Sequence, residues 1–263
     1  MFRKRRLIFV SCLAIIAVIF FNYFRGLYMV PVLMYHSVNP KVNPRMRSLI
    51  VSPESFERQM RFLKSRHYNV VTLEEVSRLM REKKRPPFKT VAITFDDGFK
   101  DNYIYAYPVL KKLGLPAAIF VIYNEVGRPE GDRLSWEQIK EMQASGLISI
   151  GSHTLGPVPL VDIKSKAELR KQIIDSKKMF EDKLKTPVDG FCYVGGLFTP
   201  QIKELVKEAG YKYAVATALG RDYSNYDPYA IKRVRVSSSS DNLFDFWARV
   251  SGYYNSFRRH KRK

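Results

Sequence analysis

Two adjacent carboxylates follow an apolar run in the segment Thr94-Phe95-Asp96-Asp97-Gly98. Neighbouring residues at the end of a strand point in different directions, so one carboxylate can bind a metal ion while the other accepts a proton. In folds that alternate strands and helices, active sites gather at the carboxyl ends of the strands. The same residues also suit an ordinary turn. The pentapeptide therefore predicts a catalytic or metal site, with a simple turn as the alternative.

Histidines follow two further apolar runs. His153 lies in Ser152-His153-Thr154, and His36 follows Met34-Tyr35. Either histidine alone can be structural, but three strand ends that each deliver His or Asp to one face favour a common site. Asp97 and His153 together can hold a divalent cation, which lowers the pKa of bound water from about 15.7 to about 7. We therefore expect a metal site that contains Asp97 and His153.

The segments that position these residues alternate between short apolar runs and amphipathic stretches. Strands are predicted at 30–35, 91–95, 117–122, 148–152, 191–194, 213–217 and 231–236. Helices are predicted at 53–65, 73–81, 103–113, 135–145, 166–184 and 200–209. Such alternation indicates a parallel α/β architecture, and periodicity alone leaves a barrel and a doubly wound sheet both open.

An uncharged apolar stretch, residues 7–24, follows a basic cluster at residues 3–6. Its length suits a helix that crosses a bilayer, and no small-x-small cleavage motif comes after it. The basic cluster is expected to stay in the cytoplasm. We interpret residues 1–6 as a cytoplasmic basic tail and 7–24 as an uncleaved transmembrane signal-anchor. The chain would then be a single-pass cell-membrane protein with an extracytoplasmic domain; a cleaved signal peptide is the alternative.

Composition limits what the rest of the chain can be. The chain has 263 residues, 46% of them hydrophobic, which is the globular range rather than the disordered one. About 235 residues remain after the leader, enough for one α/β domain. Two cysteines exclude a disulfide framework, and four histidines mean that a metal site must use carboxylates. With Cys12 in lipid and Cys192 in the domain core, no disulfide is expected.

The net charge of +20 is concentrated at the two ends of the chain, since residues 1–30 and 249–263 contain basic residues and no acidic ones. This distribution favours anionic membrane or cell-wall surfaces; no nucleic-acid motif accompanies it, so no nucleic-acid partner is expected. Residues 241–263 form an amphipathic basic C-terminal segment, with an aromatic stripe that includes Phe244 and Trp247. A final helix packed on the domain is favoured over an interfacial helix that touches anionic lipid.

The order of the motifs resembles the polysaccharide deacetylase family (the NodB homology domain), over residues 30–240. The resemblance rests on the segments VLMYHSV, VAITFDDGF, LSWEQIKEMQASGLISIGSHT, FCYVGG, GYKYAVAT and AIKRVRV. It is to membrane-associated and secreted members that act on N-acetylglucosamine polymers. It implies a distorted (β/α) barrel of about seven parallel strands, which in this chain would follow the one transmembrane helix. The implied activity is that of a metal-dependent polysaccharide N-deacetylase, a hydrolase acting on an extracytoplasmic amino-sugar polysaccharide.

The resemblance also implies roles for individual residues. By position, Asp96 matches the general base, and Asp97 and His153 match ligands of a divalent metal, with zinc expected. Tyr193 and Gly195 lie in the segment that borders the sugar, and Gly195 stands where a backbone N–H faces the oxyanion. In the implied reaction the acetamide carbonyl is polarised at the cation, Asp96 takes a proton from water, and acetate leaves.

The sequence departs from the family pattern at three places, one of which is Val194, where the FCYVGG segment would usually carry proline. The second motif is His-Ser/Thr-x-x-His, but here its last position is Pro157, which has no side-chain donor. Catalytic zinc normally has three protein ligands, and Asp162 can supply the third only if its loop folds back. His36 is the other candidate, although the resemblance places it near the site rather than on the metal. No histidine lies near residues 231–236, so His36 or a water is expected to protonate the leaving amine. Two functions stay open: an active N-deacetylase with an altered metal site, and a catalytically impaired protein that binds glycan or assists a polysaccharide secretion complex.

Overall fold

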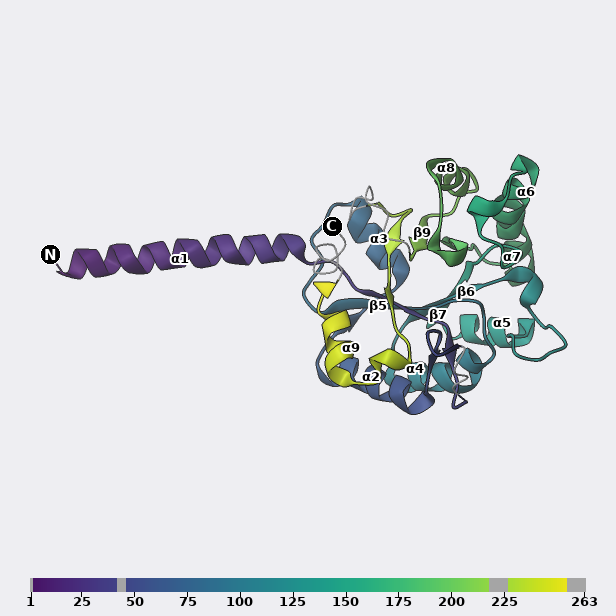
Figure 1. The fold of residues 1–263 in the computed structure, drawn as a ribbon, viewed down its shortest axis with the longest axis horizontal. Helices are drawn as coiled ribbons and strands as arrows, with labels where there is room; N and C mark the ends of the chain where they lie inside the picture. The colour runs from purple at the N-terminus through teal and green to yellow at the C-terminus, as the bar shows by residue number, and fades with distance from the viewer. Residues whose placement is uncertain (1, 42–45, 218–226, 255–263) are drawn as a thin grey trace.

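The computed structural model describes residues 2–41, 46–217 and 227–254. Its body is a parallel sheet curved into a barrel (Figure 1). The strands are β1 (Val32–Tyr35), β4 (Asn69–Val70), β5 (Thr90–Phe95), β6 (Ala117–Val121), β7 (Ile148–Ser152), β8 (Gly190–Cys192), β9 (Tyr213–Ala216), β10 (Ile231–Lys232) and β11 (Val234–Arg235). A separate parallel pair consists of β2 (Ser37–Val38) and β3 (Ile50–Val51).

One segment closes the barrel. The strand order is β10-β9-β8-β7-β6-β5-β1-β11, with β4 on the side of β5, and the pairings are parallel. Because only Arg233 separates β10 from β11, this one segment pairs with β9 at its start and with β1 at its end. Counted as one interrupted strand, it gives the seven barrel strands that were expected. The prediction of a barrel is confirmed, and the doubly wound sheet is excluded.

One helix leads into the barrel and the others lie around it (Figure 1). They are α1 (Phe2–Leu27), α2 (Pro53–Ser65), α3 (Leu73–Arg81), α4 (Tyr107–Leu113), α5 (Trp136–Ala144), α6 (Lys166–Arg170), α7 (Ser176–Leu184), α8 (Pro200–Glu208) and α9 (Leu243–Val250). The hydroxyls of Ser52, Thr72, Ser135 and Thr199 cap four of these helices by accepting from the first turn. Single π-helical turns precede α4 and join α6 to α7, within the predicted helices 103–113 and 166–184.

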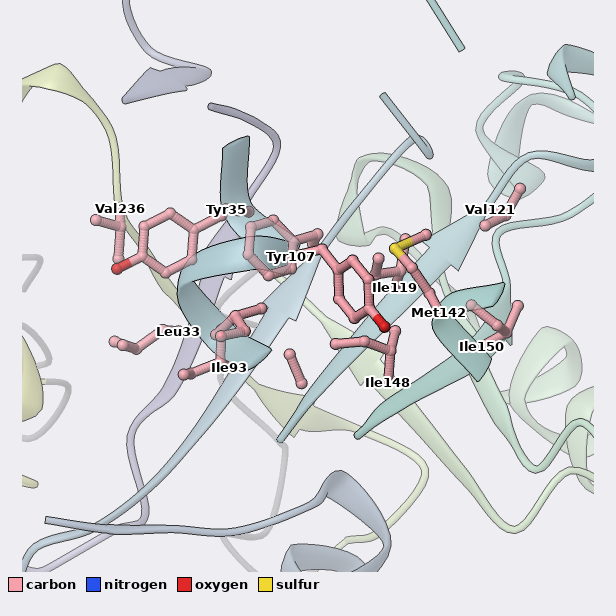
Figure 2. Packing of buried hydrophobic residues seen from close by; sticks show 14 of the residues in the cluster. Leu33, Tyr35, Ile93, Tyr107, Ile119, Val121, Met142, Ile148, Ile150 and Val236 are labelled. Carbon is pink, nitrogen blue, oxygen red and sulfur yellow. The ribbon is translucent and has the colours of Figure 1, made fainter. Parts of the chain in front are cut away.

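Alternation along the strands creates two apolar layers. The outer layer packs strand residues such as Leu33, Ile93 and Ile119 with Tyr107 of α4 and Met142 of α5 (Figure 2). The residues of opposite parity fill the interior of the barrel: Val32, Ala92, Ala118, Phe120, Cys192, Val215 and Ile231. Side chains on this inner face lead directly to the mouth of the barrel, which is where the sequence predicts the site.

Helix α1 projects alone from the body (Figure 1). Its stretch Phe9–Leu27 has a mean hydropathy of 1.9 and none of it is buried, so by length and composition it can cross a membrane. At its base, Arg25 donates to the carbonyl of Pro86 and lies 4.4 Å from the centre of the Phe88 ring. The Tyr28 hydroxyl bonds to the backbone of Thr90, the first residue of β5. Helix α1 therefore joins the barrel at the amino ends of its strands.

Helix α9 covers part of the outer layer next to α2. Phe246 and Val250 are buried there, while Phe244 and Trp247 remain 68% and 47% exposed. As predicted, a final helix, Leu243–Val250, packs on the domain. The basic residues 258–263 of the predicted C-terminal segment lie outside the described residues.

Candidate active site

The predicted site residues come together at the carboxyl ends of the barrel strands. Asp96 directly follows β5, His153 follows β7 and His36 follows β1. Cys192, which the sequence places only in the domain core, ends β8 beside them. Ligand atoms of Asp96, His153 and Cys192 all lie within 4.8 Å of one another. Parallel strands explain this, because their carboxyl ends meet at one face of the barrel.

Asp96 is held by a buried arginine that the motifs in the sequence do not identify. Arg233 Nη1 lies 2.6 Å from Asp96 Oδ1, and Nη2 lies 2.7 Å from Oδ2. Asp96 and Arg233 are only 4% and 5% exposed, and Nη1 also donates to Thr94 Oγ1. Burial alone would raise the pKa of Asp96, but the guanidinium overrides it and lowers that pKa to about 2. Asp96 is therefore ionised at neutral pH, and both of its oxygens have a fixed direction.

Asp97 faces His153. Its backbone φ of 69° is left-handed, a conformation that Asp tolerates better than most residues, and Oδ1 lies 3.5 Å from His153 Nε2. His153 Nδ1 lies 2.9 Å from the carbonyl oxygen of Cys192, which can only accept, so Nδ1 carries the hydrogen. Nε2 is therefore the nitrogen that faces Asp97 and is available to a cation.

His153 and Asp97 each favour the charged form of the other. Burial would lower the pKa of His153, but the neighbouring carboxylates of Asp97 and Asp96 raise it above its ordinary value. Burial would likewise raise the pKa of Asp97, and His153 lowers it instead. Without a cation, Asp97 and His153 thus form a charged pair at the mouth of the barrel. A divalent cation could take the place of the imidazolium proton between them.

His36 is a second histidine near Asp96. Its Nε2 is 3.9 Å from Asp96 Oδ2, beyond hydrogen-bond distance, and its Nδ1 has no hydrogen-bond partner among the described residues. Asn102 holds the backbone of His36 by donating to its carbonyl at 2.8 Å. Burial lowers the pKa of His36 in spite of Asp96 and Asp97, so the imidazole is neutral at neutral pH. A neutral histidine beside a proton acceptor can take up a proton and release it again.

The segment predicted to border the sugar forms a short 3-10 turn over Val194–Gly196. Gly195 is exposed and has a φ of 66°, which favours glycine. Tyr193 is fully buried; its ring stacks on Phe198 at 4.3 Å and its hydroxyl donates to the carbonyl of Tyr229. In this conformation the Tyr193 ring supports the turn from inside, and Gly195 is the predicted residue that reaches the surface.

The residues present fit a divalent cation, although one expected ligand is replaced. Pro157 is exposed, and Asp162, at the end of the short helix Leu160–Asp162, is exposed as well. Asp162 is not among the described ligand atoms that cluster with His153, so the loop does not fold back. The remaining donors are an imidazole nitrogen, carboxylate oxygens and the thiol of Cys192, a set that suits zinc or a similar cation.

Comparison with known sequences finds the same family. The family model described as polysaccharide deacetylase matches residues 83–214. YxkH of Bacillus subtilis (strain 168), which is named as a polysaccharide deacetylase, is 37% identical over 207 residues, covering 79% of this chain and 71% of its own. Poly-β-1,6-N-acetyl-D-glucosamine N-deacetylase of Staphylococcus aureus (strain MRSA252) is 30% identical over 213 residues, covering 77% of this chain and 73% of its own.

Solved structures agree with the sequences. IcaB from Ammonifex degensii superposes with a TM-score of 0.73 at 30% identity, over 84% of this chain and 97% of that one. The Streptococcus pyogenes deacetylase PplD, solved in complex with acetate, has a TM-score of 0.73 at 28% identity, over 82% of this chain and 97% of that one. The family model covers the motifs that contain Asp96, Asp97 and His153 and the strands β5 to β8 of the barrel. The chain therefore belongs to the polysaccharide deacetylase family of hydrolases.

Proposed function

We propose that this chain is a metal-dependent N-deacetylase that acts on an extracytoplasmic polysaccharide containing N-acetylglucosamine. The observation that carries the proposal is the ionised Asp96, fixed by Arg233 beside the Asp97–His153 pair at the mouth of the barrel. A protein that only binds glycan has no need of a buried carboxylate kept charged and aimed in this way. The substrate class is supported by the Staphylococcus aureus relative, whose name specifies poly-β-1,6-N-acetyl-D-glucosamine.

Each residue of the site has a distinct part in this proposal. Asp96 accepts a proton from the attacking water, and Arg233 keeps its carboxylate ionised and oriented until then. Asp97 and His153 hold the cation, which when bound supplies Lewis acidity toward the acetamide carbonyl and the water. The exposed Gly195 turn is assigned to the developing oxyanion through its backbone N–H. His36, neutral and 3.9 Å from Asp96, is assigned to return a proton to the leaving amine.

The direct test is acetate release by the purified full-length protein from N-acetylglucosamine oligomers, with bound divalent metal measured in the same sample. We expect one free amine to appear for each acetate released. If a concentrated sample contains no metal and releases no acetate, the proposal is wrong. The catalytically impaired, glycan-binding alternative would then hold, and Pro157 is the residue that favours it.

We also propose that residues 7–24 anchor the chain in the membrane, with residues 1–6 in the cytoplasm and the barrel outside the cell. The length and hydropathy of α1 support this. Where α1 meets the barrel, an open groove of about 620 Å³ is lined mainly by aromatic side chains, including Tyr28, Phe88 and Trp247, together with Lys89. Aromatic and basic residues together are typical of the membrane–water interface. The site lies at the opposite ends of the strands and would face away from the membrane.

This orientation predicts different environments for the two tryptophans. Trp247 is 47% exposed beside the groove, whereas Trp136 starts α5 near the carboxyl ends of the strands. In liposomes that contain brominated lipid, we expect the fluorescence of the full-length protein to be quenched through Trp247. The variant W247F should lose most of that quenching, and W136F should keep it. Equal quenching in the two variants would contradict the orientation.

A further inference from the structure

Cys192 is the buried group in the site to which the proposed reaction gives no part. Its side chain is fully buried, and Sγ lies 3.9 Å from His153 Nε2 and 3.7 Å from Asp96 Oδ1. The carbonyl of the same residue accepts from His153 Nδ1 at 2.9 Å. The end of β8 therefore contacts both nitrogens of this imidazole, the carbonyl at one and the sulfur at the other.

These distances suit ligands of one cation. With Zn–S near 2.3 Å and Zn–N near 2.0–2.1 Å, a tetrahedral site separates sulfur from nitrogen by about 3.5 Å and oxygen from nitrogen by about 3.3 Å. The structure has 3.9 Å between Cys192 Sγ and His153 Nε2, and 3.5 Å between Asp97 Oδ1 and the same nitrogen. His153 Nε2 is thus near both other donors, while the ligand atoms that lie within 4.8 Å of one another are those of Asp96, His153 and Cys192. For Asp97 and Cys192 to share one cation at Nε2, the Asp97 carboxylate has to move toward Sγ.

The arrangement also accounts for the substitution at Pro157. With proline there, Asp97 and His153 leave a catalytic cation one protein ligand short. The exposed Asp162 does not replace it. The thiol of Cys192, at the end of the strand next to β7, is the donor that lies close to His153 within the described part of the chain.

We infer that Cys192 Sγ is the third protein ligand of the divalent cation, together with His153 Nε2 and a carboxylate oxygen of Asp97. This inference rests on the proposed function, which provides the reason for a cation. Asp97 is assigned rather than Asp96 because Arg233 already occupies both oxygens of Asp96. When the cation binds, the thiol releases its proton to solvent. Arg233 Nη2, 3.2 Å from Sγ, is placed to donate to the resulting thiolate. A thiolate ligand favours zinc or cobalt over magnesium, calcium or manganese.

Cobalt titration of the full-length protein tests this directly, because a thiolate bound to Co²⁺ gives a near-ultraviolet charge-transfer band that nitrogen and oxygen ligands do not give. We expect the band with wild type and with the matched control C12S, which changes the other cysteine. The variant C192S should lose the band and bind Co²⁺ at least about 100-fold more weakly, since even lost supporting contacts cost about 10–100-fold in affinity. The double variant C192A/P157H, which returns an imidazole to the vacated position, should regain binding without the band.

The possible results separate the two proposals. If wild type binds Co²⁺ without the band, and C192S binds it equally well, the inference about Cys192 is wrong while the deacetylase proposal stands. If wild type binds no cobalt and releases no acetate, both are wrong. Far-ultraviolet circular dichroism of each variant shows whether a lost band reflects a lost fold. The double variant remains decisive if C192S is unstable, because recovery of binding without the band requires a folded site.

Discussion

Replacing Arg233 with methionine is expected to cost about 3–5 kcal/mol of unfolding free energy at neutral pH, the usual effect of removing one partner of a buried ion pair. The reason is that Asp96 is almost completely buried, and both of its oxygens accept from this guanidinium. Methionine has a similar volume, so the loss comes from the charge rather than from a cavity. Urea unfolding of the full-length protein in detergent, followed by tryptophan fluorescence, measures it.

The pH dependence of unfolding shows whether the stability lost in R233M comes from the charge of Arg233. In wild type, the lowered pKa of Asp96 stabilises the fold above the unfolded value of about 3.9, and this contribution disappears as pH falls toward about 2. In R233M, burial without the guanidinium raises the pKa of Asp96, so the variant loses stability as pH rises. The stability gap between the two proteins should therefore narrow from about pH 7.5 to about pH 4.5. The acidic limb of kcat/KM should move to higher pH, because a protonated Asp96 cannot accept a proton.

A matched control is available two residues away. Arg235 lies on β11 with an exposed side chain, and R235M removes the same charge from the same segment. It should leave stability and the acidic limb of kcat/KM, which reports on Asp96, almost unchanged. A stability gap for R233M that does not change with pH would mean that its packing, rather than its charge, matters.

The sequence predicts much of this fold because its strands and helices are locally consistent. Helices α2 and α3 begin and end at the predicted residues, and β7 has the predicted bounds, since hydroxyl caps and apolar periodicity agree there. Closure of the sheet into a barrel could not be predicted in this way. It depends on the pairing of β10 with β9 and of β11 with β1, which are contacts between distant segments that periodicity does not encode.

The site likewise has residues that the sequence indicates and residues that only the folded structure brings in. The positions of Asp96, Asp97 and His153 at the ends of apolar runs are enough to indicate chemistry from the sequence alone. Arg233 escapes such reasoning because, in the run IKRVRV, it follows Lys232 and shares its parity with the exposed Arg235, as a solvent-facing strand arginine would. Only barrel closure turns it inward onto Asp96. The prediction that Cys192 lies in the core is confirmed, and its thiol is free in the structure. Its closeness to His153 follows from the register of β7 and β8, which the sequence does not reveal.

The two neighbouring aspartates should fail in different ways when each is changed to asparagine. D96N should retain the bound cation and lower kcat by about 10²–10⁴, the usual contribution of a general base. D97N should lose the cation itself, because the ligand that faces His153 Nε2 is weakened. The reason for the split is geometric: Arg233 holds Asp96, whereas the left-handed backbone of Asp97 points its carboxylate to the imidazole.

The measurements are metal content by elemental analysis and acetate release from N-acetylglucosamine oligomers, made on the same preparations. D162N serves as the control, because it removes an exposed carboxylate from the loop that follows His153 and should change neither quantity. Loss of the cation in D96N with retention in D97N would reverse the two roles. The cation would then be held by Asp96 together with His153 and Cys192, the three residues whose ligand atoms already cluster within 4.8 Å. The paired variants thus decide which of two adjacent, chemically identical side chains moves the proton and which binds the metal.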